Sequence, residues 1–333
     1  MISPRCGSDG PSECATSTST PTWATGTRRP AEHRPGARGV LRACVDGSGS
    51  SVESSDERVI AFLSDYGLAD EFVGVCKSVM LATAPGTRII DLTHEVPPHD
   101  VKAGALALVR AAQYLPTGAI VVAVVDPGVG TERRLVAAET DAATFLGPDN
   151  GLLAPAVAMV GGARRVVSLT NDELHLPSPG PTFAGRDVLS RCAGALAAGT
   201  PIEELGEPVD PASLVPGLLS LPRELDGGAI EAEVWWIDRF GNCQLNVGPE
   251  DLHARRAGRG ASIEVRFDRI AKSARWVETY ADAKPSELVL LVDSYGMLAL
   301  ALDRRSAAAE YGLHTGSGVL LVPPGTTAPE ASS

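Results

Sequence analysis

Residues 119–134 read AIVVAVVDPGVGTERR, and this stretch decides the fold class that the sequence predicts. Small and β-branched apolar residues fill positions 119–125 without interruption, and Asp126 and Pro127 then end the run. An unbroken apolar run bounded by turn residues is typical of a strand covered on both faces, as in a parallel sheet. Because ligands of open α/β sheets bind beyond the carboxyl ends of the strands, we expect Asp126 at a ligand site, with Arg133 folded back towards its carboxylate.

The same loop has a simpler interpretation. Asp-Pro-Gly after a strand is often an ordinary turn, because Asp hydrogen-bonds its own backbone and Pro presets φ. Generic ligand motifs do not decide the matter, since the loop has neither the Gly-Lys-Ser/Thr of a P-loop nor the Gly-x-Gly-x-x-Gly of a dinucleotide loop. Both interpretations, turn and site, stay open at this point.

Composition limits the class of protein and its partners. The chain has 333 residues, 44% of them hydrophobic, which is enough for one large or two modest domains with a real core. A net charge of −12 argues against nucleic-acid and membrane partners and leaves a small molecule as the expected ligand. The 6 cysteines are scattered without a C-x-x-C pair, which favours reduced thiols and a cytoplasmic location. No apolar stretch reaches the length of a membrane span.

Shifts in composition divide the chain into segments. Residues 1–57 are rich in Ser, Thr, Pro, Gly and Arg, so we expect a disordered or over-called leader, with an organellar transit peptide as the alternative. Alternating strands and helices over 58–205 predict an α/β domain whose largely parallel sheet is flanked by helices. A turn-rich linker, 206–228, precedes the short β segments of 229–325, which predict a smaller antiparallel β-barrel-like domain. Residues 326–333 are expected to form a disordered tail.

The expected elements follow from hydrophobic periodicity and turn residues. In the α/β part, the expected strands are 59–63, 88–92, 119–125, 135–139 and 144–147, and the helices are 72–84, 101–114, 152–160 and 188–198. In the second part, the expected strands are 230–237, 244–247, 262–267, 287–292, 297–302 and 318–322.

A series of motifs in one fixed order resembles a known family. The motifs are SDYGLADEFVG (64–74), IDLTHEVPPHDVKAGA (90–105), VVDPGVGTERR (124–134), GPDNGLL (147–153), TFAGRD (182–187) and IDRFGNCQLN (237–246). Together they resemble the S-adenosyl-L-methionine (SAM) hydroxide adenosyltransferases, relatives of the SAM-dependent fluorinases and chlorinases. The resemblance implies an N-terminal α/β domain, a C-terminal β-barrel-like domain and a homotrimer with active sites between subunits. It further implies attack of water or hydroxide on C5′ of the adenosyl group, which yields adenosine and L-methionine from SAM as substrate and needs no cofactor.

The resemblance assigns substrate-binding roles to residues of the α/β part. Asp65 is the carboxylate that accepts hydrogen bonds from both ribose hydroxyls and so fixes the sugar for in-line attack. Residues Asp70, Glu71 and Phe72 match the segment near the methionine moiety. Asp70 and Glu71 are also placed to cap the helix that follows. His99 falls where an aromatic ring packs on the ligand, and Gly185 belongs to the same set.

Further binding residues are implied in the second part. Asp238 meets the methionine amino group, and Asn242 contacts adenine, with Phe240 between them in the motif. Ser294 and Tyr295 match positions that hold the methionine carboxylate and amino group. Halide-using members carry Arg at the second position, so Tyr295 weakens that contact. Each of these residues is alternatively an ordinary turn or cap residue.

Asp126 and Arg133 are the catalytic residues that the resemblance implies. The hydroxide-using branch has Asp at position 126, whereas halide-using members have Tyr there. A carboxylate repels a halide and accepts a proton from water, and Arg133 orients that carboxylate and stabilises hydroxide.

One position departs from the pattern of the hydroxide-using branch. That branch usually reads T-F-H-G-R-D, and Ala184 stands in place of its His. Ala cannot relay a proton or position water. Either Asp126 and Arg133 suffice, or the activity is slow or altered, or another imidazole reaches the site. The candidate imidazoles are His94, His99 and His175.

Three alternatives to hydrolysis stay open. A chlorinase-like halogenase is one, because Ala184 and Gly185 leave a small apolar pocket, although Asp126 opposes chloride. A SAM binder without turnover would explain the missing imidazole. The last alternative is a metal site, which a Pro-Pro pair between its imidazoles makes unfavourable and which the resemblance does not imply. Its ligands would be Asp91, His94, His99 and Asp100.

Overall fold

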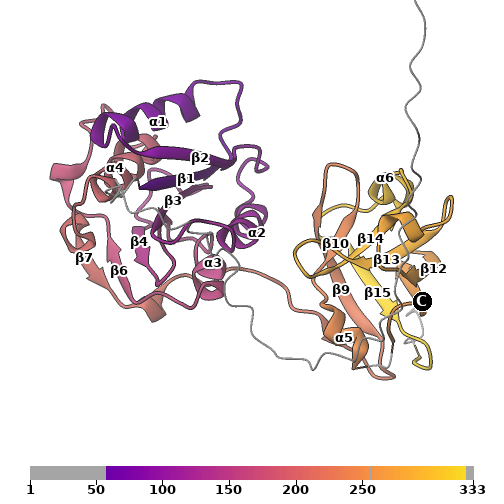
Figure 1. Ribbon diagram of the computed structural model, residues 1–333. Helices are drawn as coiled ribbons and strands as arrows, with labels where there is room; N and C mark the ends of the chain where they lie inside the picture. Colours follow the sequence, from indigo (N-terminus) through magenta and orange to yellow (C-terminus); the bar gives the residue numbers. More distant parts are fainter. Residues whose placement is uncertain (1–57, 255–256, 328–333) are drawn as a thin grey trace, which may run out of the picture. The chain divides into compact units, whose positions relative to one another are not determined.

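The computed structural model describes residues 58–254 and 257–327 (Figure 1). The predicted leader, 1–57, and nearly all of the predicted tail lie outside the described residues. No helix in the described part of the chain is long and apolar enough to cross a membrane.

The first part is built on a seven-stranded sheet with the order β2-β1-β3-β5-β4-β6-β7. Strands β1, β2, β3 and β5 pair in parallel. The pairs β5–β4, β4–β6 and β6–β7 are antiparallel, so β4 and β7 run against the direction of the other five strands. The prediction of a largely parallel sheet is therefore confirmed. The strands are β1 (Val59–Ser64), β2 (Arg88–Thr93), β3 (Ala119–Val124), β4 (Leu135–Glu139), β5 (Ala143–Pro148), β6 (Arg165–Ser168) and β7 (Glu207–Val209).

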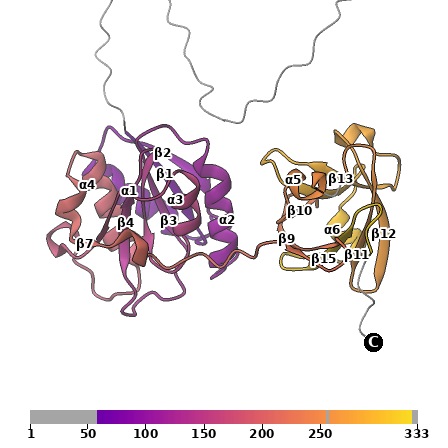
Figure 2. The ribbon, with the colours of Figure 1, turned by 90° about the horizontal axis from the view of Figure 1, so that it is seen from below.

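Helices cover both faces of this sheet, as Figure 2 shows. Ile60 and Phe62 of β1 join the core formed with α1 (Phe72–Thr83) and α4 (Ser190–Ala197). Their neighbours Ala61 and Leu63 join the opposite core, formed with α2 (Val101–Ala112) and α3 (Ala154–Met159). All six residues of β3 are buried, which explains why that strand reads as one apolar run rather than an alternating one. A π-helical turn (Gly185–Leu189) leads directly into α4.

The second part is a closed barrel with an additional short strand. The sheet order is β10-β14-β13-β12-β11-β15-β9-β8, and β10 also pairs with β9, so seven strands close and β8 extends the edge. The predicted barrel is confirmed, with one departure from antiparallel pairing, because β12 and β13 are parallel. The strands are β8 (Arg223–Glu224), β9 (Ile230–Ile237), β10 (Cys243–Leu245), β11 (Ser262–Phe267), β12 (Ile270–Trp276), β13 (Leu288–Val292), β14 (Leu298–Leu302) and β15 (Gly318–Val322), with helices α5 (Pro249–His253) and α6 (Ala307–Tyr311).

Hydrophobic periodicity missed several strands for identifiable reasons. The first four residues of β12 are exposed, so this strand lacks a buried stripe in its sequence. Strand β6 has only 4 residues and β8 only 2. Strand β7 contains Pro208 and falls within the predicted linker. Because proline has no backbone N–H to donate, it is found within sheets mainly in edge strands, and β7 is the edge strand of its sheet.

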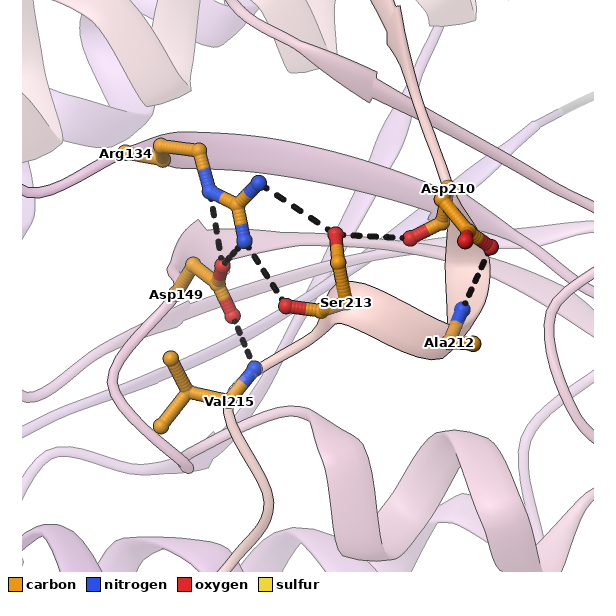
Figure 3. A network of polar contacts seen from close by, with 6 residues as sticks. All are labelled: Arg134, Asp149, Asp210, Ala212, Ser213 and Val215. Atoms are coloured by element: carbon orange, nitrogen blue, oxygen red, sulfur yellow. Dashed lines mark hydrogen bonds and ion pairs between the residues drawn. The ribbon is translucent and has the colours of Figure 1, made fainter.

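An ion pair between a buried carboxylate and a partly exposed guanidinium fixes the chain segment that leaves the α/β part (Figure 3). The Asp149 carboxylate, just after β5, accepts hydrogen bonds from Nε of Arg134 at 3.0 Å and from the backbone N–H of Val215 at 2.8 Å. Arg134 also donates from Nη2 to the carbonyl of Ser213 at 2.8 Å. Ser213 and Val215 of the predicted linker, 206–228, are thus held by the α/β part. The predicted domain boundaries stay predictions.

Candidate active site

The carboxyl ends of two neighbouring parallel strands bring Asp65 and Asp126 to one edge of the sheet. Ser64 of β1 lies opposite Val124 of β3, and the backbone N–H of Asp65 donates to the Val124 carbonyl at 3.2 Å. Asp65 directly follows β1, and Asp126 follows β3 after one further residue. This is the edge at which the sequence predicts a ligand site.

Arg133 folds back onto Asp126, as expected from the sequence. Its Nε lies 3.0 Å from both carboxylate oxygens, and Nη2 makes a further contact to Oδ2. The side chain of Asp126 is only 7% exposed and that of Arg133 16%, so the pair is held in one geometry with little water around it. Gly130, at φ +81°, supplies the left-handed residue that returns the loop. The catalytic role of the pair stays a prediction.

A cavity of about 390 Å³ gathers most of the predicted residues of the α/β part. Its lining includes Asp65, Phe72, His99, Asp126 and Gly185, together with Ala184. The cavity is thus bounded by the ends of β1 and β3, the start of α1, the loop before α2 and the start of the π-helical turn.

Asp70 and Glu71 do not line this cavity, and both are exposed. Glu71 occupies the N-cap position of α1 but makes no side-chain capping hydrogen bond, so the predicted cap is wrong at this residue. The physical reason is that its backbone (φ −75°, ψ −4°) is already helical, whereas a capping residue is extended and aims its oxygen at the free N–H groups. The binding role implied for the two carboxylates stays a prediction.

His99 positions Asp65 through its backbone rather than its ring. Its N–H donates to Oδ2 of Asp65 at 2.9 Å. His99 adopts φ +67°, a left-handed conformation that is costly for a residue with a Cβ and that clusters at functional sites. Each carboxylate oxygen accepts two hydrogen bonds, so Asp65 keeps enough capacity for two ribose hydroxyls.

Of the three imidazoles that could replace the missing His, His99 is the one that lines the cavity. His94 is buried, with Nδ1 2.8 Å from Oγ of Ser64 and Nε2 3.2 Å from Asp91. His175 lies with Nδ1 3.3 Å from Asp172. Neither of these two rings lines the cavity.

The structure does not gather the four candidate ligands of the alternative metal site. Within 58–254 and 257–327, no group of three or more His, Cys, Asp or Glu side chains is arranged to hold a metal ion. Asp100 instead caps α2 by accepting from the N–H of Ala103 at 2.8 Å, and His99 projects from a strained turn. The four candidate ligands, Asp91, His94, His99 and Asp100, therefore do not converge.

An aromatic wall, of which the sequence interpretation named only Phe72, completes the cavity. The rings of Tyr66, Phe72 and Phe183 pack edge to face, with centroids 5.3–5.8 Å apart. A Cβ at Gly185 would lie 2.1 Å from the Tyr66 hydroxyl, so this position has room for glycine alone. Tyr66 and Phe183 each stand close to a predicted residue within the quoted motifs, and an aromatic residue beside a strand end was the available signal.

The barrel has its own cavity, of about 890 Å³. Its lining includes all the residues predicted in this part, which are Asp238, Phe240, Asn242, Ser294 and Tyr295. Oδ1 of Asp238 accepts from the N–H groups of Phe240 and Asn242, both at 2.9 Å, and Oδ2 accepts from the Asn242 amide at 2.7 Å. Asp238 is therefore a turn residue, as the simpler interpretation has it, and Oδ2 keeps a lone pair for a ligand.

Polar residues that the sequence interpretation missed also line the barrel cavity. Gln244, 3% exposed on β10, contacts Asp293, whose Oδ1 accepts from the N–H of Tyr295 at 2.8 Å. Burial, and then the charges of Asp238 and Asp293, raises the pKa of Tyr280 in the same lining. A buried glutamine within a strand was the signal for this group. The barrel cavity and the α/β cavity have no lining residue in common.

Comparison with known proteins identifies the family. Residues 60–206 match the model of the SAM hydroxide adenosyltransferase N-terminal domain, and residues 232–320 match that of the C-terminal domain. The chain belongs to the SAM hydroxide adenosyltransferase family. The resemblance inferred from the motifs is thus confirmed.

Similar proteins include relatives whose names state an activity. A protein of Salinispora tropica named (R)-S-adenosyl-L-methionine hydrolase is 42% identical over 77% of this chain and 95% of its own length. One of Thermus thermophilus with the same name is 40% identical over 80% of this chain and 100% of its own. A fluorinase of Actinoplanes is 28% identical over 78% of this chain and 95% of its own. An uncharacterized conserved protein from Thermotoga maritima, solved by crystallography, superposes with a TM-score of 0.74 at 30% identity, covering 79% of this chain and 99% of that one.

Proposed function

We propose that this family member is an enzyme that hydrolyses SAM to adenosine and L-methionine by attack of water or hydroxide on C5′ of the adenosyl group. The observation that carries the proposal is the Asp126 carboxylate, clamped by Arg133 and lining the same cavity as Asp65. Relatives at 40–43% identity are named (R)-S-adenosyl-L-methionine hydrolase, which supports the same reaction for this chain.

In the proposed reaction, Asp65 binds the ribose and thereby places C5′ in front of Asp126. A water molecule attacks C5′ in line with the C5′–S bond, whose electron pair leaves with sulfur as the thioether of L-methionine. Asp126 accepts the water proton, and Arg133 keeps the carboxylate oriented towards the water. Because a sulfonium is already a good leaving group, the proposal requires no cofactor, and SAM is the substrate.

The carboxylate at position 126 also favours water over halide in this proposal. A halide ion next to Asp126 meets a negative charge in a mostly buried setting, where like charges repel strongly. Arg133 is already engaged by the carboxylate, so its positive charge is not free for a halide. The fluorinase relatives are also less similar, at 26–29% identity.

The assembly that we propose is a homotrimer with each active site formed by two subunits. The α/β cavity is lined by the candidate catalytic carboxylate and by the carboxylate expected to bind ribose. The barrel cavity is lined by the residues expected to bind the methionine and adenine parts of SAM. One substrate needs both sets, and they share no lining residue within one chain.

A cytoplasmic location belongs to the same proposal. The described cysteines, Cys76, Cys192 and Cys243, are buried and unpaired. Burial raises the pKa of the Cys76 thiol to about 11, and that of Cys192 to about 12. Such thiols are unreactive and suit a reducing compartment.

The test is chromatography of the products after incubating the purified chain with SAM of either sulfonium configuration, with and without excess chloride. The proposal predicts adenosine and methionine in equal amounts, unaffected by chloride. A chloride-dependent 5′-chloro product would show a halogenase instead. Binding of SAM by calorimetry without any product would show a binder.

A further inference from the structure

In the α/β cavity, the residue at position 184 supplies no polar partner for a water molecule beside Asp126. Ala184 lines the cavity at the position where the family pattern has His, and its methyl group neither donates nor accepts a hydrogen bond. Arg133 is turned towards the Asp126 carboxylate rather than the cavity, which its side chain does not line. A water molecule that contacts Asp126 alone keeps its rotational freedom, and that freedom is costly for in-line attack.

The hydroxyl of Tyr66 lies next to the place of the missing imidazole. Tyr66 lines the same cavity as Asp126 and Ala184. Its Oη approaches the backbone of Gly185 so closely that a Cβ there would lie 2.1 Å from it. Gly185 directly follows Ala184, and both line the cavity together with Tyr66, so the phenol lies beside the segment that carries the family His.

The hydroxyl is fixed in place and lacks a protein partner. Phe72 and Phe183 pack edge to face on the Tyr66 ring at 5.8 and 5.6 Å between centroids. Within the part of the chain that the structure describes, the Tyr66 backbone N–H donates to Ser64, but its hydroxyl makes no hydrogen bond to protein. A largely buried hydroxyl normally finds a partner, and the cavity is where a water molecule would supply one.

The electrostatic surroundings determine what the hydroxyl can do. Burial raises the pKa of Tyr66 far above its usual value, and the neighbouring Cys76, Asp65 and Asp126 raise it further, while Arg133 opposes them. The phenol therefore stays neutral at physiological pH, when it both donates and accepts a hydrogen bond but does not act as a base. Proton acceptance stays with Asp126.

We propose that the Tyr66 hydroxyl holds the attacking water beside Asp126, in the role that an imidazole at position 184 would otherwise fill. The inference rests on the proposed hydrolysis of SAM. One water O–H donates to Asp126, which takes that proton as the C5′–O bond forms and the C5′–S bond breaks. The other O–H donates to the phenol oxygen, which leaves a water lone pair directed at C5′.

The first test is the variant Tyr66→Phe, which removes the hydroxyl and keeps the ring between Phe72 and Phe183. We expect kcat to fall about tenfold or more, as for loss of a positioned polar group, while KM for SAM stays unchanged. The matched control is Tyr311→Phe, which removes a hydroxyl in the barrel, where Tyr311 packs on Phe267. The kcat of Tyr311→Phe should equal that of the unmodified chain.

The second test repeats Tyr66→Phe in a chain that already carries Ala184→His. If the two groups hold the same water, the imidazole replaces the phenol, and the loss in kcat shrinks to about twofold or less, a non-additivity typical of residues that share a partner. Unchanged kcat in Tyr66→Phe, or an equal loss in both backgrounds, would overturn the inference. If the unmodified chain makes no adenosine, the proposed hydrolysis fails, and the inference fails with it. If the unmodified chain forms adenosine and Tyr66→Phe keeps the same kcat, the inference about Tyr66 is overturned while the proposed hydrolysis stands.

Discussion

At the scale of single residues, the candidate chemistry centres on the Asp126 carboxylate. Both its oxygens contact Arg133, and the pair is mostly buried, so replacing the carboxylate by an amide keeps the side-chain volume but removes the charge and one of the two acceptors. Asn has the same shape but does not accept a proton from water.

Asp126→Asn should therefore lower kcat by about 10²–10⁴-fold, the range for removing a general base, while SAM binding is largely retained. Steady-state rates of adenosine formation, together with calorimetric titration of SAM, measure the two effects separately. Near-normal turnover would remove Asp126 from the catalytic role.

Ala184→His should raise the rate of hydrolysis, because the imidazole of the family pattern adds a polar partner that orients the water more strongly than the neutral phenol of Tyr66 and can also relay a proton. The expected gain is about tenfold if the site is otherwise that of the hydroxide-using branch. The measurement is kcat at saturating SAM. The melting temperature serves as a check on the neighbouring Phe183, whose ring packs on Tyr66 and Phe72. An unchanged or lower rate in a folded protein would indicate that the site is arranged differently.

The sequence predicted the residue-scale site unevenly. Asp65, Asp126 and Gly185 were identifiable because they follow strands or stand in motifs, and they line one cavity. Tyr66 and Phe183 were missed because an aromatic residue beside a turn is as typical of a core as of a ligand wall. Only the packing of their rings around one cavity distinguishes the two.

At the scale of elements, two ion pairs hold segments that hydrophobic burial alone does not fix. The first is the Arg134–Asp149 pair of Figure 3, which ties the 3₁₀ helix η4 (Pro211–Ser213) and Val215 to the end of β5. The Asp149 side chain is 3% exposed, so its loss leaves several donors unpaired.

Asp149→Ala should lower the free energy of unfolding by about 1–3 kcal/mol, as for removing a buried acceptor of several hydrogen bonds. The matched control is Asp141→Ala, which breaks the exposed pair with Arg164 and should cost less than about 1 kcal/mol. Denaturant unfolding of both variants provides the comparison. Equal losses in the free energy of unfolding for the two variants would show that the network in Figure 3 does not stabilise the fold more than an exposed ion pair does.

The second pair links the parallel strands of the barrel. Arg275 of β12 donates from Nε and Nη2 to the two oxygens of Glu287, which precedes β13, both at 2.8 Å. These hydrogen bonds, with one from the backbone N–H of Lys284, lower the pKa of Glu287 from its ordinary value of 4.5 to about 2.

Because the folded-state pKa of Glu287 is depressed, its contribution to stability is present above about pH 4.5 and is lost as pH falls towards about 2. Glu287→Gln should therefore melt at a lower temperature than the unmodified chain at pH 7, and the difference should narrow as pH falls through this window. Glu278→Gln, which breaks an exposed pair with Arg259, serves as the control. A difference that does not depend on pH would contradict the assignment.

Periodicity predicted most elements of the α/β part because its central strands are buried on both faces and its helices carry one apolar face. It failed at β12, whose first residues are exposed, and at β7, where Pro208 stands in the strand. Strand β12 is held by its antiparallel pairing with β11, which directly precedes it, and β7 is held by pairing with β6. Hydropathy does not record such pairing.

At the scale of the whole molecule, the proposed trimer makes a specific prediction about mixed subunits. Asp126→Asn removes the candidate catalytic carboxylate from the α/β cavity, and Ser294→Trp places a bulky ring in the barrel cavity, where it obstructs ligand binding. If each site uses the α/β cavity of one subunit and the barrel cavity of another, co-assembled subunits of the two variants contain some intact sites.

Equal mixing of the two inactive variants during expression should restore about one quarter of the unmodified activity, since each half of a site is intact with a probability of about one half. Light scattering measures the mass of the assembly. Each variant expressed alone is the control. A mixture as inactive as its components would contradict a site shared between subunits.

Attack of water on C5′ is tested most directly by the mass of the adenosine formed from SAM in water enriched in oxygen-18. We expect one solvent oxygen in the 5′-hydroxyl of each adenosine formed, and very little labelled product from Asp126→Asn. Unlabelled adenosine from the unmodified chain would contradict attack of water on C5′, and with it the role of Asp126 as the base.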